Sequence, residues 1–262
     1  MARQARVRAS PTASPPASPL RLYIEDARRP LHILLFVAPL VALYELGMLV
    51  LLPRHPDLLP NLAHEGLLRF FTAFGVKAAL FIPGLVLLVV LLLWQFLSAQ
   101  SWRPRWSVPP LMAVESVVAA MPLLVVAQLV ARVLPATGGG IDQRIAEMDL
   151  SARLVVSLGA GLFEELVFRM VLIALIHTIL VDLGRASSAV GSTVAVLVSA
   201  VVFAWYHPLE GPQGGLSVQR LVFFLLAGLW FGAIFVNRGF GIAVGAHVAY
   251  DAIVAGWLLG RE

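Results

Sequence analysis

The chain of 262 residues contains no cysteine. Disulfide bonds, a thiolate nucleophile and cysteine-ligated metals are therefore excluded. Any catalytic chemistry has to rely on serine, threonine, lysine, histidine or carboxylate side chains. The chain has only six histidines, so the position of each one can be considered separately.

Charged residues are also scarce, because Asp, Glu, Lys and Arg make up 13% of the chain and hydrophobic residues 60%. This composition leaves too little polar surface for a water-soluble domain, so we expect most of the chain to lie in a lipid bilayer. The net charge is +4, but the basic residues form no stripe and lie mainly between apolar runs. They are typical of loops that set membrane topology, and no nucleic-acid partner is expected.

The apolar residues are grouped into runs of roughly 17 to 25 residues, the length that crosses the hydrocarbon core of a bilayer. Breaks between the runs contain proline, glycine or charged residues. The pattern predicts an all-α fold, a polytopic transmembrane bundle of about seven helices. The predicted helices lie near residues 31–52, 73–97, 111–134, 154–180, 188–206, 221–236 and 240–259.

Residues 1–30 combine six arginines with proline, serine and alanine. Such a segment cannot bury enough apolar surface to offset its ordering entropy, which predicts a disordered tail on the cytoplasmic side. Residues 31–149 are expected to form three transmembrane helices, and residues 150–259 a core domain. The Ala-, Val-, Leu- and Arg-rich composition favours a bacterial cytoplasmic (inner) membrane.

Three of the predicted helices carry pairs of small residues four positions apart. The pairs are Ser157/Gly161, Gly228/Gly232 and Gly241/Gly245. Small residues let helix backbones approach closely in lipid, so these helices are expected to form a tight inner bundle.

Two carboxylates and a guanidinium interrupt the run 154–180. Each costs roughly 2.5 to 3.5 kcal/mol in the middle of a span, so we expect Glu164, Glu165 and Arg169 to face the protein interior. Glu165 and Arg169 stand four residues apart with the acid first, which predicts an ion pair. Glu164 is rotated by about 100° from Glu165 and is left for another role.

Two further predicted helices carry histidines. Phe203 and His207 share a face at the end of one helix, where Pro208 stops it. His247 and Asp251 form a second pair four residues apart in the last helix. A structural role is the alternative for each. His207 could be an interfacial side chain, His247 could make an interhelical hydrogen bond, and the cluster of Glu164, Glu165 and Arg169 could only lock helices together.

The ordered motifs Glu164-Glu165-x-x-x-Arg169, Phe203-x-x-x-His207 and His247-x-x-x-Asp251 resemble the CAAX-protease and bacteriocin-processing (CPBP, or Abi) family. The resemblance covers about residues 150–255 and implies an all-α intramembrane endopeptidase. It does not extend to the first three predicted helices.

The resemblance also implies roles for the motif residues. Glu164 and His207 would activate a water molecule, and His247 with Asp251 would form the oxyanion hole. Glu165, Arg169 and Phe203 would organise the site. No cofactor is then needed, and the partners are the lipid bilayer and a membrane protein or peptide substrate. The substrate could include prenylated CAAX proteins, although a bacterial membrane would rather supply other peptides.

Position 251 is Asp here, where the family motif also allows Asn. An ionised carboxylate cannot donate a hydrogen bond to an oxyanion. Asp251 is therefore either protonated and a donor, or it orients His247 so that the imidazole alone donates.

Three alternative functions use the same sequence features. Glu164, His207, His247 and Asp251 could bind zinc with an open position for water, although no His-Glu-x-x-His motif is present. Intramembrane acids also mark ion pathways, so an ion-coupled transporter is a second alternative, against which the lack of an internal repeat argues. A non-catalytic immunity or scaffold protein is the third.

Overall fold

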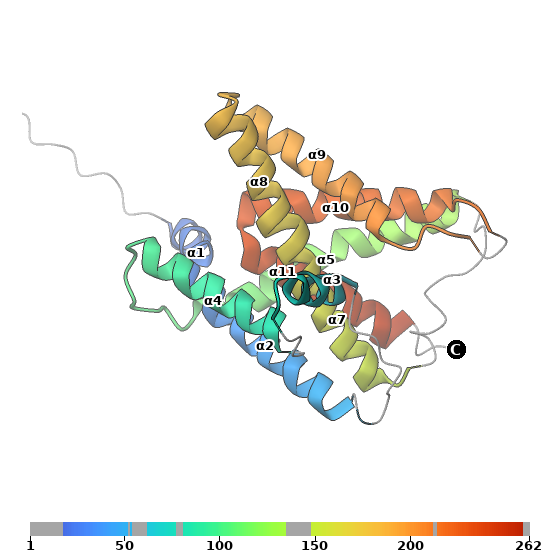
Figure 1. The fold of residues 1–262 in the computed structure, drawn as a ribbon, viewed down its shortest axis with the longest axis horizontal. Coiled ribbons are helices and arrows are strands. Elements are labelled where there is room, and N and C mark those ends of the chain that lie inside the picture. The colour runs from blue at the N-terminus through green and yellow to red at the C-terminus, as the bar shows by residue number, and fades with distance from the viewer. Residues whose placement is uncertain are drawn as a thin grey trace, which may run out of the picture.

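The computed structural model describes residues 18–51, 53, 62–76, 81–134, 148–211 and 214–258. Over these residues the chain is helical, apart from turns and one isolated β-bridge between Glu210 and Leu216. The predicted all-α fold is confirmed (Figure 1).

The apolar helices account for all the predicted spans. By length and composition, five can cross a membrane and two further apolar helices are shorter among the described residues. The helices are α2 (Pro30–Leu51), α4 (Ile82–Leu97), α5 (Val108–Val133), α7 (Leu150–Glu165), α9 (Ser188–Tyr206), α10 (Val218–Arg238) and α11 (Phe240–Ile253). After α7 the same span continues through η1 (Leu166–Ile173), α8 (Ala174–His177) and η2 (Thr178–Leu183), and α11 continues into η3 (Val254–Leu258). The chain is thus an integral membrane protein.

The prediction of a disordered tail over residues 1–30 was wrong in its last part. Helix α1 (Pro19–Ala27) begins at Ser18, whose side chain accepts a hydrogen bond from the backbone N–H of Arg21. Asp26 then ties the end of α1 to the loop before α5, because its carboxylate lies 2.7 Å from Arg105. Although burial opposes ionisation of Asp26, its hydrogen bonds with Arg105 and Arg29 hold its pKa below the ordinary value. Residues 1–17 lie outside the described residues.

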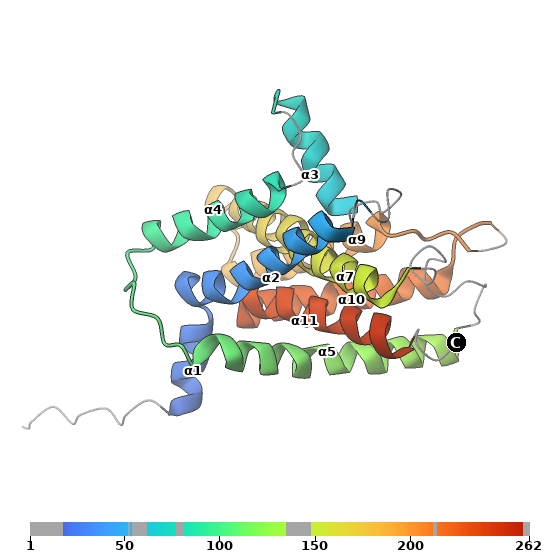
Figure 2. The same cartoon turned by 90° about the horizontal axis from the view of Figure 1, so that it is seen from below.

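The predicted span 73–97 was also placed too early. The turn after α3 (Leu62–Ala73) contains Gly75, whose φ of +78° favours glycine. The apolar helix α4 begins only at Ile82. Figure 2 shows α3 projecting away from the other helices, beside the point where α2 ends.

Close helix approach occurs at glycines of the expected inner bundle, but only Gly161 joins two of its three helices, whereas Gly228 approaches α9. A Cβ atom on Gly161 of α7 would lie 2.8 Å from the backbone nitrogen of Val248 in α11, and one on Gly228 of α10 would lie 2.8 Å from the Cα of Ala200 in α9. Side chains at these positions would force the helices apart. Figure 2 shows α11 lying between α5 and the other helices, so its middle part is enclosed, and residues Phe240 to His247 are all buried.

Candidate active site

The three sequence motifs meet at one place inside the bundle. Glu164 Oε2 at the end of α7 lies 3.6 Å from His207 Nε2 and 3.9 Å from His247 Nε2. The Glu164 side chain is only 4% exposed, whereas that of His207 is 15% exposed. One carboxylate therefore faces two imidazoles in a nearly enclosed space, with an approach from the His207 side.

Glu165 joins two other members of the cluster. Its Oε1 atom lies 3.2 Å from NH1 of Arg169, and both side chains are fully buried. This is the predicted ion pair between residues four apart. The same oxygen lies 2.8 Å from Nδ1 of His247, a contact that the sequence did not predict. Because an ionised Glu165 can only accept, His247 donates the Nδ1 hydrogen, which turns Nε2 toward Glu164 and Asp251.

Arg169 is held by backbone and aromatic groups as well as by Glu165. One of its NH2 hydrogens is directed at the carbonyl oxygen of Gly228, at 3.4 Å. The guanidinium lies over the ring of Phe203, with 4.2 Å between its central carbon and the ring centroid. A cation over an aromatic face is stabilised in a desolvated site. Phe203 thus contacts the charged cluster directly.

His207 lies one residue beyond the end of α9, in an extended backbone conformation. Its Nδ1 atom is 2.8 Å from the carbonyl oxygen of Phe203 and donates a hydrogen bond to it. In the neutral imidazole, Nε2 is therefore the atom that can accept a proton. Burial lowers the pKa of His207 below its ordinary value, and the Glu164 carboxylate partly opposes this shift. The neutral form thus persists to lower pH than in a solvent-exposed histidine.

Asp251 lies at the edge of the cluster. Its Oδ2 atom is 3.5 Å from Nε2 of His247, one turn earlier on α11, and its side chain is 27% exposed. Glu165 already occupies the other ring nitrogen of His247. Asp251 thus lies beside Nε2 of His247, while Glu165 contacts the other ring nitrogen.

A π-helical segment follows the two glutamates directly. The backbone changes from α-helix to π-helix after Glu165, and Arg169 lies within this segment. The carbonyl oxygen of Phe168 accepts a hydrogen bond of 2.8 Å from the buried Ser199 hydroxyl. Such wide turns are frequent at functional sites. Ser199 therefore forms a hydrogen bond with the backbone of η1, a role that no sequence motif indicated.

The N-terminal helices cover the side of α7 next to Glu164. The Tyr44 hydroxyl of α2 is 2.7 Å from Nδ1 of His64 in α3. Both rings pack edge-on against Phe163, at centroid distances of 5.2 and 4.7 Å. The Tyr206 hydroxyl accepts a hydrogen bond from the backbone of Ala63. Sequence reasoning missed these residues because they lie outside the three motifs.

The cluster contains residue types that bind zinc. In the part of the chain that the structure describes, no three His, Asp or Glu side chains are grouped so that they could hold a metal ion. Both Nδ1 atoms are engaged, by Glu165 and by the Phe203 carbonyl, an arrangement that histidines at zinc sites also show.

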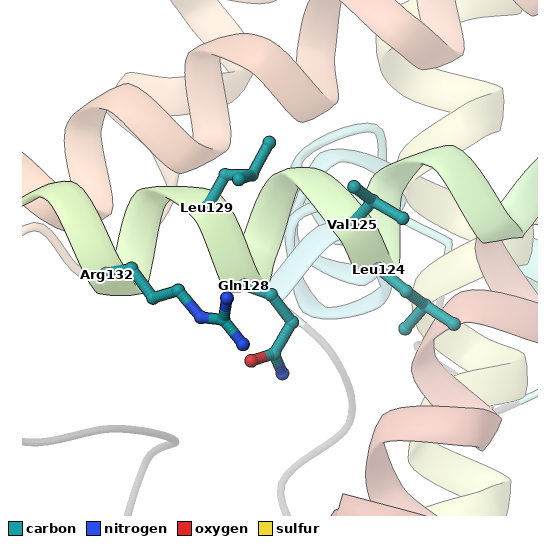
Figure 3. Close-up of a pocket in the computed structure, with 5 residues that line it drawn as sticks. All are labelled: Leu124, Val125, Gln128, Leu129 and Arg132. Atoms are coloured by element: carbon teal, nitrogen blue, oxygen red, sulfur yellow. The ribbon is translucent and has the colours of Figure 1, made fainter.

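A separate hollow lies on the outer side of α5. It is lined by Leu124, Val125, Gln128, Leu129 and Arg132. Figure 3 shows Gln128 and Arg132 one turn apart on the same side of the helix. This lining contains neither a carboxylate nor an imidazole, so the acid–base groups discussed above belong to a different part of the molecule.

An all-α membrane bundle that buries paired carboxylates against two histidines indicates a membrane-embedded hydrolase. Residues 147–253 match the family model described as "Type II CAAX prenyl endopeptidase Rce1-like". This segment includes every residue of the cluster, and the match agrees with the resemblance to the CPBP family seen in the sequence. No curated protein and no solved structure matches the chain.

Proposed function

We propose that this protein is an intramembrane endopeptidase in which Glu164 and His207 activate a water molecule. The observation that carries the proposal is the 3.6 Å separation of Glu164 Oε2 and His207 Nε2. This separation is longer than a direct hydrogen bond and suits two groups that share a bridging water.

In the proposed reaction, the water gives a proton to the Glu164–His207 pair as its oxygen attacks the carbonyl carbon of a peptide bond. The hydrogen bond from Nδ1 of His207 to Phe203 leaves Nε2 available as an acceptor. The pair then returns the proton to the departing amine, so that the peptide bond is broken and a carboxylic acid and an amine are formed. Neither residue is covalently changed at the end of the cycle.

The negative charge that develops on the carbonyl oxygen needs a donor. His247 supplies it if its imidazole is protonated, because Nδ1–H then donates to Glu165 while Nε2–H points into the site. Arg169 balances the charge of Glu165 and keeps that carboxylate in place. A protonated Asp251, at the exposed edge, would be a second donor.

The substrate class that we propose is a membrane-associated protein or peptide. The matching family is named for prenylated CAAX substrates, so a quenched fluorescent peptide with an S-farnesylated cysteine is the first probe. Mass spectrometry of peptides in membranes with active and Glu164→Gln protein would identify natural substrates. No difference between the two membranes, together with no cleavage of the probe, would contradict an endopeptidase.

We also propose that the end of the bundle that carries α1 faces the cytoplasm. Figure 2 shows α1 where α2 and α5 begin. Arg28, Arg29, Arg103 and Arg105 lie in the segments at this end, and such residues are retained on the cytoplasmic side.

Asp251→Asn is expected to keep the cleavage rate within about tenfold of the wild type, a change of roughly 1.4 kcal/mol in the barrier. A carboxyl group loses its donor proton as the pH rises, whereas an amide donates at every pH. The wild-type rate should therefore fall more steeply at alkaline pH than the variant's rate, because only His247 still loses a donor proton in the variant. Rates measured from acidic to alkaline pH for both proteins check this.

An inactive Asp251→Asn protein would contradict the donor role. If Asp251 instead held the tautomer of His247, the substitution should reduce turnover by orders of magnitude, roughly 10⁴-fold as in hydrolytic triads. Loss of a bound metal together with activity would identify Asp251 as a ligand.

We propose that no metal takes part in catalysis. The reason is that the sequence resembles a family pattern in which these residues activate water and form the oxyanion hole, and that it lacks the His-Glu-x-x-His spacing of common zinc peptidases. Purified protein is expected to keep its full activity after dialysis against a strong chelator. One stoichiometric zinc ion whose removal and return switched cleavage off and on would contradict this.

A further inference from the structure

The middle of α10, residues 221–236, contains no titratable residue and none of the three motifs. It nevertheless contacts the catalytic cluster. The ring of Phe224 stacks on the imidazole of His207, with 3.9 Å between centroids and 21° between planes. Stacking at this distance fixes the plane of the imidazole as well as its position.

A second phenylalanine does the same for the other imidazole. The ring of Phe231 lies 4.5 Å from that of His247 and is tilted by only 13°. Phe224 and Phe231 are seven residues apart, which puts them on the same face of a helix, about 10 Å apart along its axis. Each ring therefore stacks on one of the two imidazoles that approach Glu164.

Gly228 lies between the two phenylalanines on this face. Its carbonyl oxygen accepts the hydrogen bond from Arg169. Its lack of a side chain lets α10 approach Ala200 of α9 closely, since a Cβ atom would be 2.8 Å from the Ala200 Cα. Close contact with α9 also keeps Phe224 near the end of α9, where His207 lies.

We propose that Phe224, Gly228 and Phe231 form a positioning face of α10 that fixes the two imidazole planes and the Arg169 guanidinium. The inference rests on the proposed function and adds to it three residues that do not touch the reacting atoms. His207 depends on this face most, because it lies beyond the end of its own helix. A misplacement of about 1 Å in a catalytic group can cost roughly 100-fold in rate.

Phe224→Leu should therefore lower kcat for the farnesylated peptide by about tenfold or more, with little change in KM. Phe224→Tyr keeps the ring and should retain activity. The matched control is Phe223→Leu, because Phe223 is the neighbouring residue and its ring packs on Tyr250 and edge-on against Phe224 rather than on an imidazole. It should alter neither constant. A loss of activity in Phe223→Leu equal to that in Phe224→Leu would overturn the proposal.

The pH profile gives a second readout. His207 is faced by Glu164 from α7, by His247 from α11 and by Arg169 from η1. Removal of the Phe224 ring admits water, so the pKa of His207 should rise toward its ordinary value of 6.5. The acidic limb of the rate profile should move to higher pH in Phe224→Leu. A variant that was only less stable would keep the wild-type profile.

Nitrogen-15 NMR of labelled histidines, recorded on the full chain in detergent micelles, tests the proposal without substrate. Signals of His207 and His247 are assigned by their loss in His207→Gln and His247→Gln. We expect Phe224→Leu to shift the His207 signal alone and Phe231→Leu to shift the His247 signal alone. Unchanged signals in both variants would refute the positioning face. If the wild type failed to cleave any probe, the proposed function would fail, while this experiment would still decide the inference.

Discussion

The Glu164→Gln protein is expected to lose cleavage activity by roughly 10² to 10⁴-fold, the contribution usual for a positioned general base. Glutamine has nearly the same shape, so the contacts around it are kept, but it cannot take a proton from water. Glu164 Oε2 lies 3.6 Å from Nε2 of His207 and 3.9 Å from Nε2 of His247. We expect no other side chain to take over its role as the base. Rates with the farnesylated peptide, measured at matched protein concentration, check this expectation.

Stability is the control for this substitution. Thermal unfolding of Glu164→Gln in detergent should stay close to that of the wild type, because the ion pair of Glu165 with Arg169 is untouched. An active Glu164→Gln protein would show that Glu164 is not the base. A protein that lost activity only because it unfolded would leave Glu164 with a structural role.

The second large effect is expected from Glu165→Gln, in the free energy of unfolding. This substitution leaves the fully buried Arg169 without its charged partner, which costs roughly 3 to 5 kcal/mol for a buried pair. It also weakens the hydrogen bond that orients His247. The variant should therefore unfold at a clearly lower temperature than Glu164→Gln, and it should cleave more slowly than the wild type.

A double substitution separates the cost of an unpaired buried charge from the cost of altered packing. Arg169→Met combined with Glu165→Gln removes the unpaired charge, so the double variant should be more stable than Glu165→Gln alone. If Glu164→Gln destabilised the protein more than Glu165→Gln did, the division of roles between the two glutamates would be wrong.

The contacts within each helix could be predicted from the sequence. The pairing of Glu165 with Arg169 follows from their spacing on a single helix, and the structure has it at 3.2 Å. The close approach of helices at Gly161 and Gly228 follows from small-residue pairs. These inferences depend only on helix geometry, which fixes neighbours three and four residues away.

The particular side chains that meet between helices could not be derived in this way. The hydrogen bond from His247 to Glu165 joins residues 82 positions apart, and its existence depends on how α7 and α11 cross. The stacking of Phe224 and Phe231 on the imidazoles has the same origin. In the sequence these phenylalanines are ordinary apolar residues of a membrane span.

Two local features also differ from the sequence prediction for physical reasons. Helix α1 forms in a polar segment because Ser18 caps it and Asp26 pairs with Arg29 and Arg105. The π-helical turn after Glu165 adds a residue per turn and is supported by Ser199 from another helix. Tertiary contacts thus override local composition in both places.

The most direct test of the central claim is a double-variant cycle of Glu164→Gln and His207→Gln, with cleavage products quantified by mass spectrometry over long incubations. Residues that act together on one water are strongly non-additive. We predict that the double variant cleaves the farnesylated peptide about as slowly as the slower single variant. A rate in the double variant equal to the product of the two separate losses would contradict the account.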